Sequence, residues 1–166
     1  MNRWLLHIVL LLSLICTNFS YSQSNINHKE VLRLMNLCRT DGPKFIKEVA
    51  EPYIESNKLA KTGKVASLIR ELKKTKGLPI LKIDKELNNA AQSWAVKSGK
   101  QGVIGHNGIK TRLYKLKRGT MAENCTYGNH TALDAIMSLL IDKYSASLGH
   151  RKNILNPSLE YVGIGS

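Results

Sequence analysis

Apolar residues recur at helical spacing along most of this chain, and only one late segment, 161–164, is predicted as a clear strand. The plainest helix follows Asp84, a predicted N-cap whose side chain can accept hydrogen bonds from free backbone N–H groups. Its apolar stripe, at helical intervals on one face, consists of Leu87, Ala90, Ala91, Trp94 and Ala95. A chain with many helices and few strands is predicted to fold as α+β with a small sheet.

Five other segments are predicted as helices or, for the last of them, as a turn or helix, and glycine or proline residues separate several of them. Residues 99–130 lie between the helix that follows Asp84 and the helix capped by Thr131; they are glycine-spaced and are predicted to be mostly loop. The five segments are 27–39, 43–56 and 64–76, a helix capped by Thr131 with Asp134 in its first turn, and a short turn or helix at 148–155.

The first 22 residues have the features of an export signal. Arg3 supplies a positive start, residues 4–16 are mostly apolar, and small serines stand where a signal peptidase would cleave near Ser22. The apolar run is shorter than the roughly 20 residues of an ordinary membrane span. We therefore expect a mature domain of residues 23–166 that is secreted or periplasmic and is not an integral membrane protein. An uncleaved anchor or a buried helix is the alternative.

The chain is strongly basic, with a formal net charge of +13, of which about +12 belongs to residues 23–166. Lysine and arginine gather in two stretches, 58–76 and 110–118. Such charge favours an anionic cell-envelope or lipid surface as partner. These two stretches contain a single aromatic residue, Tyr114, and not the series of aromatics that would favour nucleic-acid stacking, so we expect no nucleic-acid partner. The alternative is an ordinary solvated helix face.

Only two cysteines, Cys38 and Cys125, follow the predicted signal segment. One disulfide between them is an option in an oxidising compartment. The sequence alone does not place the two sulfur atoms within reach of each other, and it contains no zinc-finger spacing.

Three short clusters place a histidine or an acid beside glycine, asparagine or proline. They contain His106 (Gly-His-Asn-Gly), Glu123 (Ala-Glu-Asn) and His150, which lies in the nine-residue string 149–157. Turns of this composition can direct a side chain toward a binding site. Each cluster alone is weak evidence, and the nine-residue string is the most specific of the three.

Together these clusters resemble the CAP superfamily (cysteine-rich secretory proteins, antigen 5 and pathogenesis-related proteins) in its bacterial form. The resemblance runs from about Val31 to the end of the sequence. It implies an α-β-α sandwich with a small antiparallel sheet and a central cleft. The matching motifs are Asn36…Arg39, Gly77-Leu78-Pro79…Leu81…Asp84, His106, Glu123-Asn124, the string 149–156 and Val162-Gly163-Ile164-Gly165.

Two features depart from the family pattern. The sequence stops at Ser166, where the family adds a further strand, so we expect a sheet that lacks its last strand. The segment at about 40–76 is longer than the usual link, and we expect it to form a basic helical insert that covers one face of the domain.

In the family, two histidines and two acids line the cleft. Residue by residue, the resemblance places His106, Glu123 and His150 in this tetrad, and Asp142 where the family has a longer glutamate. His106 and His150 are the expected metal ligands. Zinc or another divalent cation suits two imidazoles with carboxylate neighbours. The alternative is a hydrogen-bonded structural cluster without a cofactor.

Two classes of function follow. The first is an exported binding or interaction module whose site takes a divalent metal or a lipid-like ligand. The alternative is a metal-assisted hydrolase, such as a peptidase, that uses Glu123 as general base. A catalytic pair of Cys125 and His150 is a further enzyme variant, which a disulfide from Cys125 to Cys38 would exclude.

Overall fold

A computed structural model describes residues 26–116 and 119–166. The predicted signal segment lies outside these residues. Among the described helices, none has both the length and the apolar character needed to cross a membrane. The elements are α1 (His28–Thr40), α2 (Gly42–Phe45), a π-helical turn η1 (Ile46–Ala50), α3 (Glu51–Ser56), α4 (Gly63–Leu72), β1 (Lys82–Ile83), α5 (Lys85–Gln101), α6 (Ile109–Tyr114), α7 (Ala132–Ile141), α8 (Gly149–Ile154) and β2 (Tyr161–Val162).

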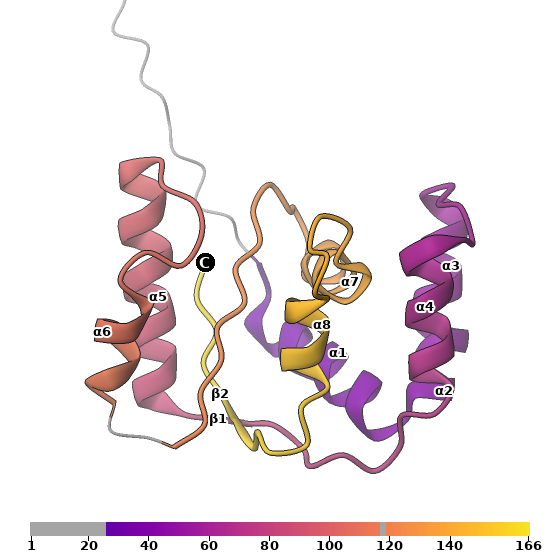
Figure 1. Cartoon of the computed structure of the whole chain (residues 1–166), viewed down its shortest axis with the longest axis horizontal. Coiled ribbons are helices and arrows are strands. Elements are labelled where there is room, and N and C mark those ends of the chain that lie inside the picture. Colours follow the sequence, from indigo (N-terminus) through magenta and orange to yellow (C-terminus); the bar gives the residue numbers. More distant parts are fainter. Residues whose placement is uncertain (1–25, 117–118) are drawn as a thin grey trace, which may run out of the picture.

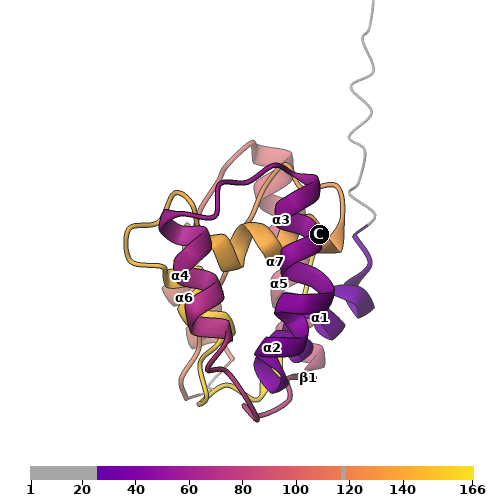
Figure 2. The same ribbon diagram turned by 90° about the vertical axis from the view of Figure 1, so that its right-hand side faces the viewer.

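The small sheet lies between two groups of helices. Figure 1 shows α5 and α6 on one side of β1 and β2, and α1, α7 and α8 on the other. The α2–α4 segment lies outside the second group and faces the viewer in Figure 2. This arrangement is mostly helical with a small sheet, so the predicted α+β class with helices on both sides of the sheet is confirmed.

The two strands are parallel, whereas an antiparallel sheet was expected. Lys82 is paired with Tyr161, and Ile83 with Val162. The chain leaves β1 into α5 and returns to β2 only after α8, so β2 enters the sheet from the same end as β1. A long crossover of this kind permits parallel pairing, whereas antiparallel strands are commonly joined by a tight hairpin.

The segment at β2 approaches α5 very closely, which explains its glycines. A Cβ atom on Gly163 would lie 2.0 Å from the backbone carbonyl carbon of Leu87, and one on Gly165 would lie 2.3 Å from the backbone nitrogen of Gln92. The N–H of Ile164 donates to the side-chain oxygen of Asn88 at 2.7 Å. Glycine therefore lets this segment contact the backbone of α5.

The helix starts follow the capping chemistry predicted from the sequence. Asp84 Oδ1 accepts from the N–H of Leu87 at 2.9 Å at the start of α5. Thr131 Oγ1 accepts from the N–H of Asp134 at 3.0 Å, which is the expected N-cap of α7. The reciprocal contact of Asp134 is to the Thr131 hydroxyl, which donates to its carboxylate at 2.7 Å, and not to the backbone N–H of a capping box. The short segment at 148–155 is a helix, α8.

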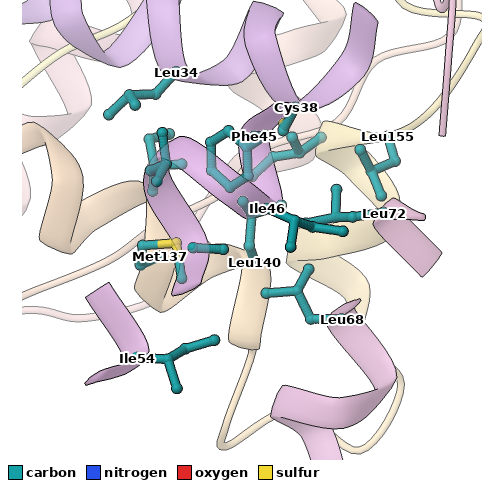
Figure 3. Close-up of a cluster of buried hydrophobic side chains, with 14 of the residues drawn as sticks. Leu34, Cys38, Phe45, Ile46, Ile54, Leu68, Leu72, Met137, Leu140 and Leu155 are labelled. Atoms are coloured by element: carbon teal, nitrogen blue, oxygen red, sulfur yellow. The ribbon is translucent and has the colours of Figure 1, made fainter. Parts of the chain in front are cut away.

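The segment 40–76 is part of the core, and not only a cover over it. Figure 3 shows its apolar side chains packed against those of α1, α7 and the end of α8. Each fully buried valine, leucine, isoleucine or phenylalanine side chain stabilises the fold by roughly 1.5–3 kcal/mol relative to an exposed one. The core residues from this segment are Phe45, Ile46, Val49, Ala50, Ile54, Val65, Leu68 and Leu72.

The fully buried Arg39 joins α1 to two distant segments. Its guanidinium donates to the carbonyl oxygens of Pro79 (2.9 Å), Ile154 (2.7 Å), Asn156 (2.9 Å) and Leu159 (2.8 Å). Because four carbonyl groups replace the water lost on burial, this arginine holds together α1, the link before β1 and the loop after α8.

Candidate functional site

The first half of the candidate site joins His106 to Glu123. His106 lies in the loop between α5 and α6, and Glu123 lies in the extended segment before α7. His106 Nδ1 lies 2.9 Å from Glu123 Oε1. The histidine side chain is 41% exposed and the glutamate side chain 17%, so the imidazole faces solvent while its carboxylate partner is largely covered.

The second half joins Asp142 to His150. Asp142 ends α7 in the left-handed conformation (φ 53°), and His150 lies in the first turn of α8. One carboxylate oxygen accepts from the backbone N–H of His150 at 3.0 Å, and the other lies 2.9 Å from Nδ1 of its ring. The shorter aspartate reaches the ring because the turn from α7 to α8 brings the two residues together.

The structure brings all four predicted tetrad residues into one place. The ring centroids of His106 and His150 are 6.4 Å apart, with an interplanar angle of 36°. Asn124 links the halves, since its Nδ2 donates to the backbone oxygen of His150 at 3.0 Å and its Oδ1 accepts from Asn153 at 2.8 Å. A shallow groove elsewhere, lined by α5 side chains between residues 89 and 101, contains none of the tetrad.

Each carboxylate fixes the tautomer of its histidine. An ionised carboxylate only accepts hydrogen bonds, so Nδ1 of His106 and of His150 must carry the proton. Nε2 then carries the lone pair of a neutral ring. Across 26–116 and 119–166, Nε2 of neither ring has a hydrogen-bond partner. Carboxylate-oriented imidazoles of this kind are typical metal ligands, and the donor set fits a divalent cation.

Arg112 is a site residue that the sequence did not identify. Its Nη2 donates to both oxygens of Glu123, at 2.7 and 2.6 Å. The guanidinium lies over the Trp94 ring, 3.9 Å from its centroid, and also donates to the backbone oxygen of Asn107. In the sequence it stood out only as one of several cations in 110–118, and nothing in that stretch indicated a carboxylate partner.

The contacts of Glu123 keep it ionised. Burial raises the pKa of this carboxyl, but the hydrogen bonds from Arg112 and His106, together with their charges, outweigh burial and hold the pKa below its ordinary value. Glu123 is therefore a fixed anion and hydrogen-bond acceptor near neutral pH.

Cys125 contacts the first half of the tetrad. Its Sγ lies 3.6 Å from His106 Nδ1 and 3.7 Å from Glu123 Oε1. Burial raises the pKa of the thiol, and the negative charge of Glu123 raises it further. The thiol is thus held protonated. It approaches the same nitrogen of His106 that donates to Glu123, which is unlike a nucleophile–base–acid relay, where the two partners use opposite ring nitrogens.

The disulfide that the sequence left open is not formed in this structure, where both cysteines are free. Cys38 is fully buried in the hydrophobic core (Figure 3), and its Sγ donates to the backbone oxygen of Met35 at 3.1 Å. Burial raises the pKa of this thiol to about 12. Cys125 lies instead beside His106 and Glu123, so the two thiols are in different parts of the domain.

Helix α4 holds the Asp142–His150 half in place. Lys64 Nζ donates to the backbone oxygens of Asp142 (2.8 Å) and Ser145. The fully buried Arg151, next to His150, donates to Ser67 Oγ at 2.8 Å and to the backbone oxygen of Lys64 at 3.1 Å. The segment expected as an insert therefore holds this half of the site through hydrogen bonds from α4.

Comparison with known proteins agrees with this architecture. A family model described as "CAP: Cysteine-rich secretory protein family" matches residues 32–166. No similar curated protein and no similar solved structure was found. The match covers most of the chain and includes all four tetrad residues. The chain belongs to the cysteine-rich secretory protein (CAP) family.

Proposed function

We propose that this CAP domain is an exported binding module that holds a divalent cation between His106 and His150. The observation that carries the proposal is the pairing of each ring with its own carboxylate at 2.9 Å, with ring centroids 6.4 Å apart. With metal–nitrogen bonds of about 2.0–2.1 Å and a tetrahedral angle, the centroids of two imidazole ligands lie roughly 5 Å apart, so the two rings would move about 1 Å closer together to share one ion.

The charges around the pair favour a cation. Asp142 is 3% exposed and sits behind His150, where low dielectric strengthens its interaction with positive charge. Glu123 supplies a second anion, which Arg112 partly neutralises. With two protein nitrogens as ligands, the remaining coordination positions are open to water or to an oxygen atom of a lipid-like or protein ligand.

The hydrolase alternative has weaker support. A general base works best when its pKa lies near the working pH. Here Arg112 occupies both oxygens of Glu123, and the pKa of this carboxyl is lowered after the opposing effect of burial. The protonated state of Cys125 likewise does not favour a thiolate nucleophile. Binding therefore fits the contacts of these residues better than catalysis does.

Export and attachment to an anionic surface complete the proposal. They rest on residues 1–22, which carry the features of a signal peptide, and on the net charge of about +12 that remains after them. Several cations on and after α4 are exposed and available for such attachment. They include Arg70, Lys73, Lys74 and Lys76. Phospholipid vesicles with and without anionic headgroups test this part: salt-sensitive binding to the anionic vesicles alone is the expected result.

The cation site is tested by zinc titration followed by thermal melting. Ligand that binds only the folded state stabilises it, by about 2.7 kcal/mol at one hundred times Kd. We expect zinc to raise the melting temperature of the natural protein, but not that of the variant with both His106→Ala and His150→Ala. His130→Ala, an exposed histidine outside the tetrad, is the matched control and should keep the shift. If millimolar zinc does not change the melting temperature of the natural protein, the proposal is refuted.

A further inference from the structure

Cys125, His106 and Glu123 form a second group of potential metal ligands. Their donor atoms lie within 4.8 Å of one another. The three separations are 3.6 Å between Cys125 Sγ and His106 Nδ1, 3.7 Å between Cys125 Sγ and Glu123 Oε1, and 2.9 Å between His106 Nδ1 and Glu123 Oε1. This group uses Nδ1 of His106, whereas the pair with His150 uses Nε2.

The dimensions of this triangle match one face of a tetrahedral zinc site. With typical zinc bonds to sulfur, nitrogen and oxygen, the ligand atoms of a tetrahedron lie about 3.5 Å apart for S–N and S–O, and about 3.3 Å apart for N–O. The two separations to sulfur already agree with these values. The shorter distance from His106 to Glu123 is that of a hydrogen bond, which an ion would replace.

We propose that Cys125, His106 and Glu123 form a thiolate-containing site for zinc or another thiophilic cation, distinct from the paired-histidine site. On binding, Cys125 releases its proton to solvent and coordinates as thiolate, and the proton of His106 moves from Nδ1 to Nε2. The fourth position faces solvent on the exposed side of His106 and remains open to water.

Arg112 orients the carboxylate for this role. Glu123 Oε1 faces both Cys125 and His106, and Arg112 Nη2 donates to Oε1 at 2.7 Å and to Oε2 at 2.6 Å. An ion at Oε1 would replace the first of these two hydrogen bonds, while Oε2 stays fixed by the guanidinium, as ligand carboxylates commonly are. The stacking of Arg112 on Trp94 fixes the guanidinium in turn.

The two sites share His106, and this determines how they relate. A neutral imidazole has one lone pair for one ion. His106 can therefore bind an ion together with Cys125 or together with His150, but not both at once. Sulfur ligands favour zinc and softer cations, whereas magnesium and calcium prefer oxygen. The thiolate site adds Cys125 as a ligand, and it extends the proposed function by giving the domain a preference for thiophilic ions.

Cobalt titration under anaerobic conditions tests the site directly. Cobalt replaces zinc, and a bound thiolate adds a charge-transfer band in the near ultraviolet. We expect this band in the natural protein and in His150→Ala, and its loss in Cys125→Ser and His106→Ala. Cys38→Ala, which changes the buried thiol, should keep the band.

A second measurement, alkylation, does not depend on any variant folding. The rate at which iodoacetamide modifies Cys125 in the natural protein, followed by peptide mass spectrometry, should fall at least tenfold when zinc is added. Magnesium at the same concentration should leave the rate unchanged.

The outcomes separate the two proposals. Absence of the band in the natural protein, together with an alkylation rate that zinc does not change, overturns the thiolate site and leaves the paired-histidine site intact. A zinc-induced melting shift that is lost in Cys125→Ser, with the band present in the natural protein, overturns the paired-histidine site and supports the thiolate site.

Discussion

Asp142 binds His150 twice, through the backbone N–H at 3.0 Å and through ring Nδ1 at 2.9 Å. The carboxylate is nearly inaccessible to solvent, because it lies at the turn between α7 and α8. This double contact fixes the backbone, the ring orientation and the tautomer of His150 together. The chemistry of the ring is therefore set by a residue eight positions earlier.

Replacement of Asp142 by asparagine should weaken zinc binding by about 10–100-fold, the usual effect of losing a partner behind a metal ligand. The amide is neutral and can present an N–H to the ring, so the favoured tautomer is lost. Zinc affinity measured by calorimetry checks this. Glu160→Gln, an exposed acid outside the site, is the control and should bind as the natural protein does. Equal affinity in both variants would contradict the role of Asp142.

Replacement of Arg112 by methionine should change the acid stability of the domain. The pKa of Glu123 is held below its ordinary value of 4.5, so in the folded state the carboxylate contributes stability above pH 4.5 that is lost as the pH falls through the lowered value. Without Arg112 the pKa of Glu123 is lowered less, so the domain should lose less stability through this carboxyl as the pH falls. Melting temperatures from pH 3 to pH 7 measure it, with Arg70→Met, an exposed arginine, as control. Parallel curves for the natural protein and Arg112→Met would count against this assignment.

Lys64 should act on the site from helix α4. Its Nζ donates to the backbone oxygens of Asp142 and Ser145, so Lys64→Met should lower the free energy of unfolding by about 0.5–1.5 kcal/mol. It should also reduce zinc affinity, because the turn that carries Asp142 loses its support. Lys73→Met, which alters an exposed lysine just beyond the same helix, should change neither quantity. Urea unfolding and zinc titration of both variants check this, and a loss of stability without any loss of affinity would refute the positioning role.

Gly163→Ala should destabilise the fold, because its new Cβ would overlap the backbone of Leu87 at 2.0 Å. Overpacking of this kind costs typically about 1–3 kcal/mol, and the contact with backbone places the expected cost at the upper end. Gly119→Ala is the matched control, since its Cβ would meet open space. Urea unfolding of the two variants measures the difference. Equal midpoints would show that β2 does not need to approach α5 so closely.

Local features of the fold were predictable from the sequence. The caps at Asp84 and Thr131 depend on residues within three positions of each other, so a short window of sequence contains the whole interaction. The apolar stripes predicted the helices for the same reason. The family resemblance supplied the four tetrad residues, including Asp142, whose place rested on an imperfect match.

Features that depend on distant segments were not predictable in this way. Arg112 donates to Glu123 although the two residues are 11 positions apart, and the basic stretch around Arg112 offers no sign of that contact. The parallel order of the strands depends on where the chain re-enters the sheet after α8. The segment 40–76 was interpreted as a basic insert because of its lysines, but its apolar side chains supply much of the core.

Nitrogen NMR of the two imidazoles during zinc addition tests the paired-histidine site most directly. The experiment uses the Cys125→Ser variant, in which the thiolate ligand is removed and His106 is left to pair with His150. We predict that the Nε2 resonances of both rings shift together and saturate at one equivalent of zinc, while both Nδ1 atoms keep their protons. Zinc binding that leaves the His150 ring unchanged would contradict a shared ion.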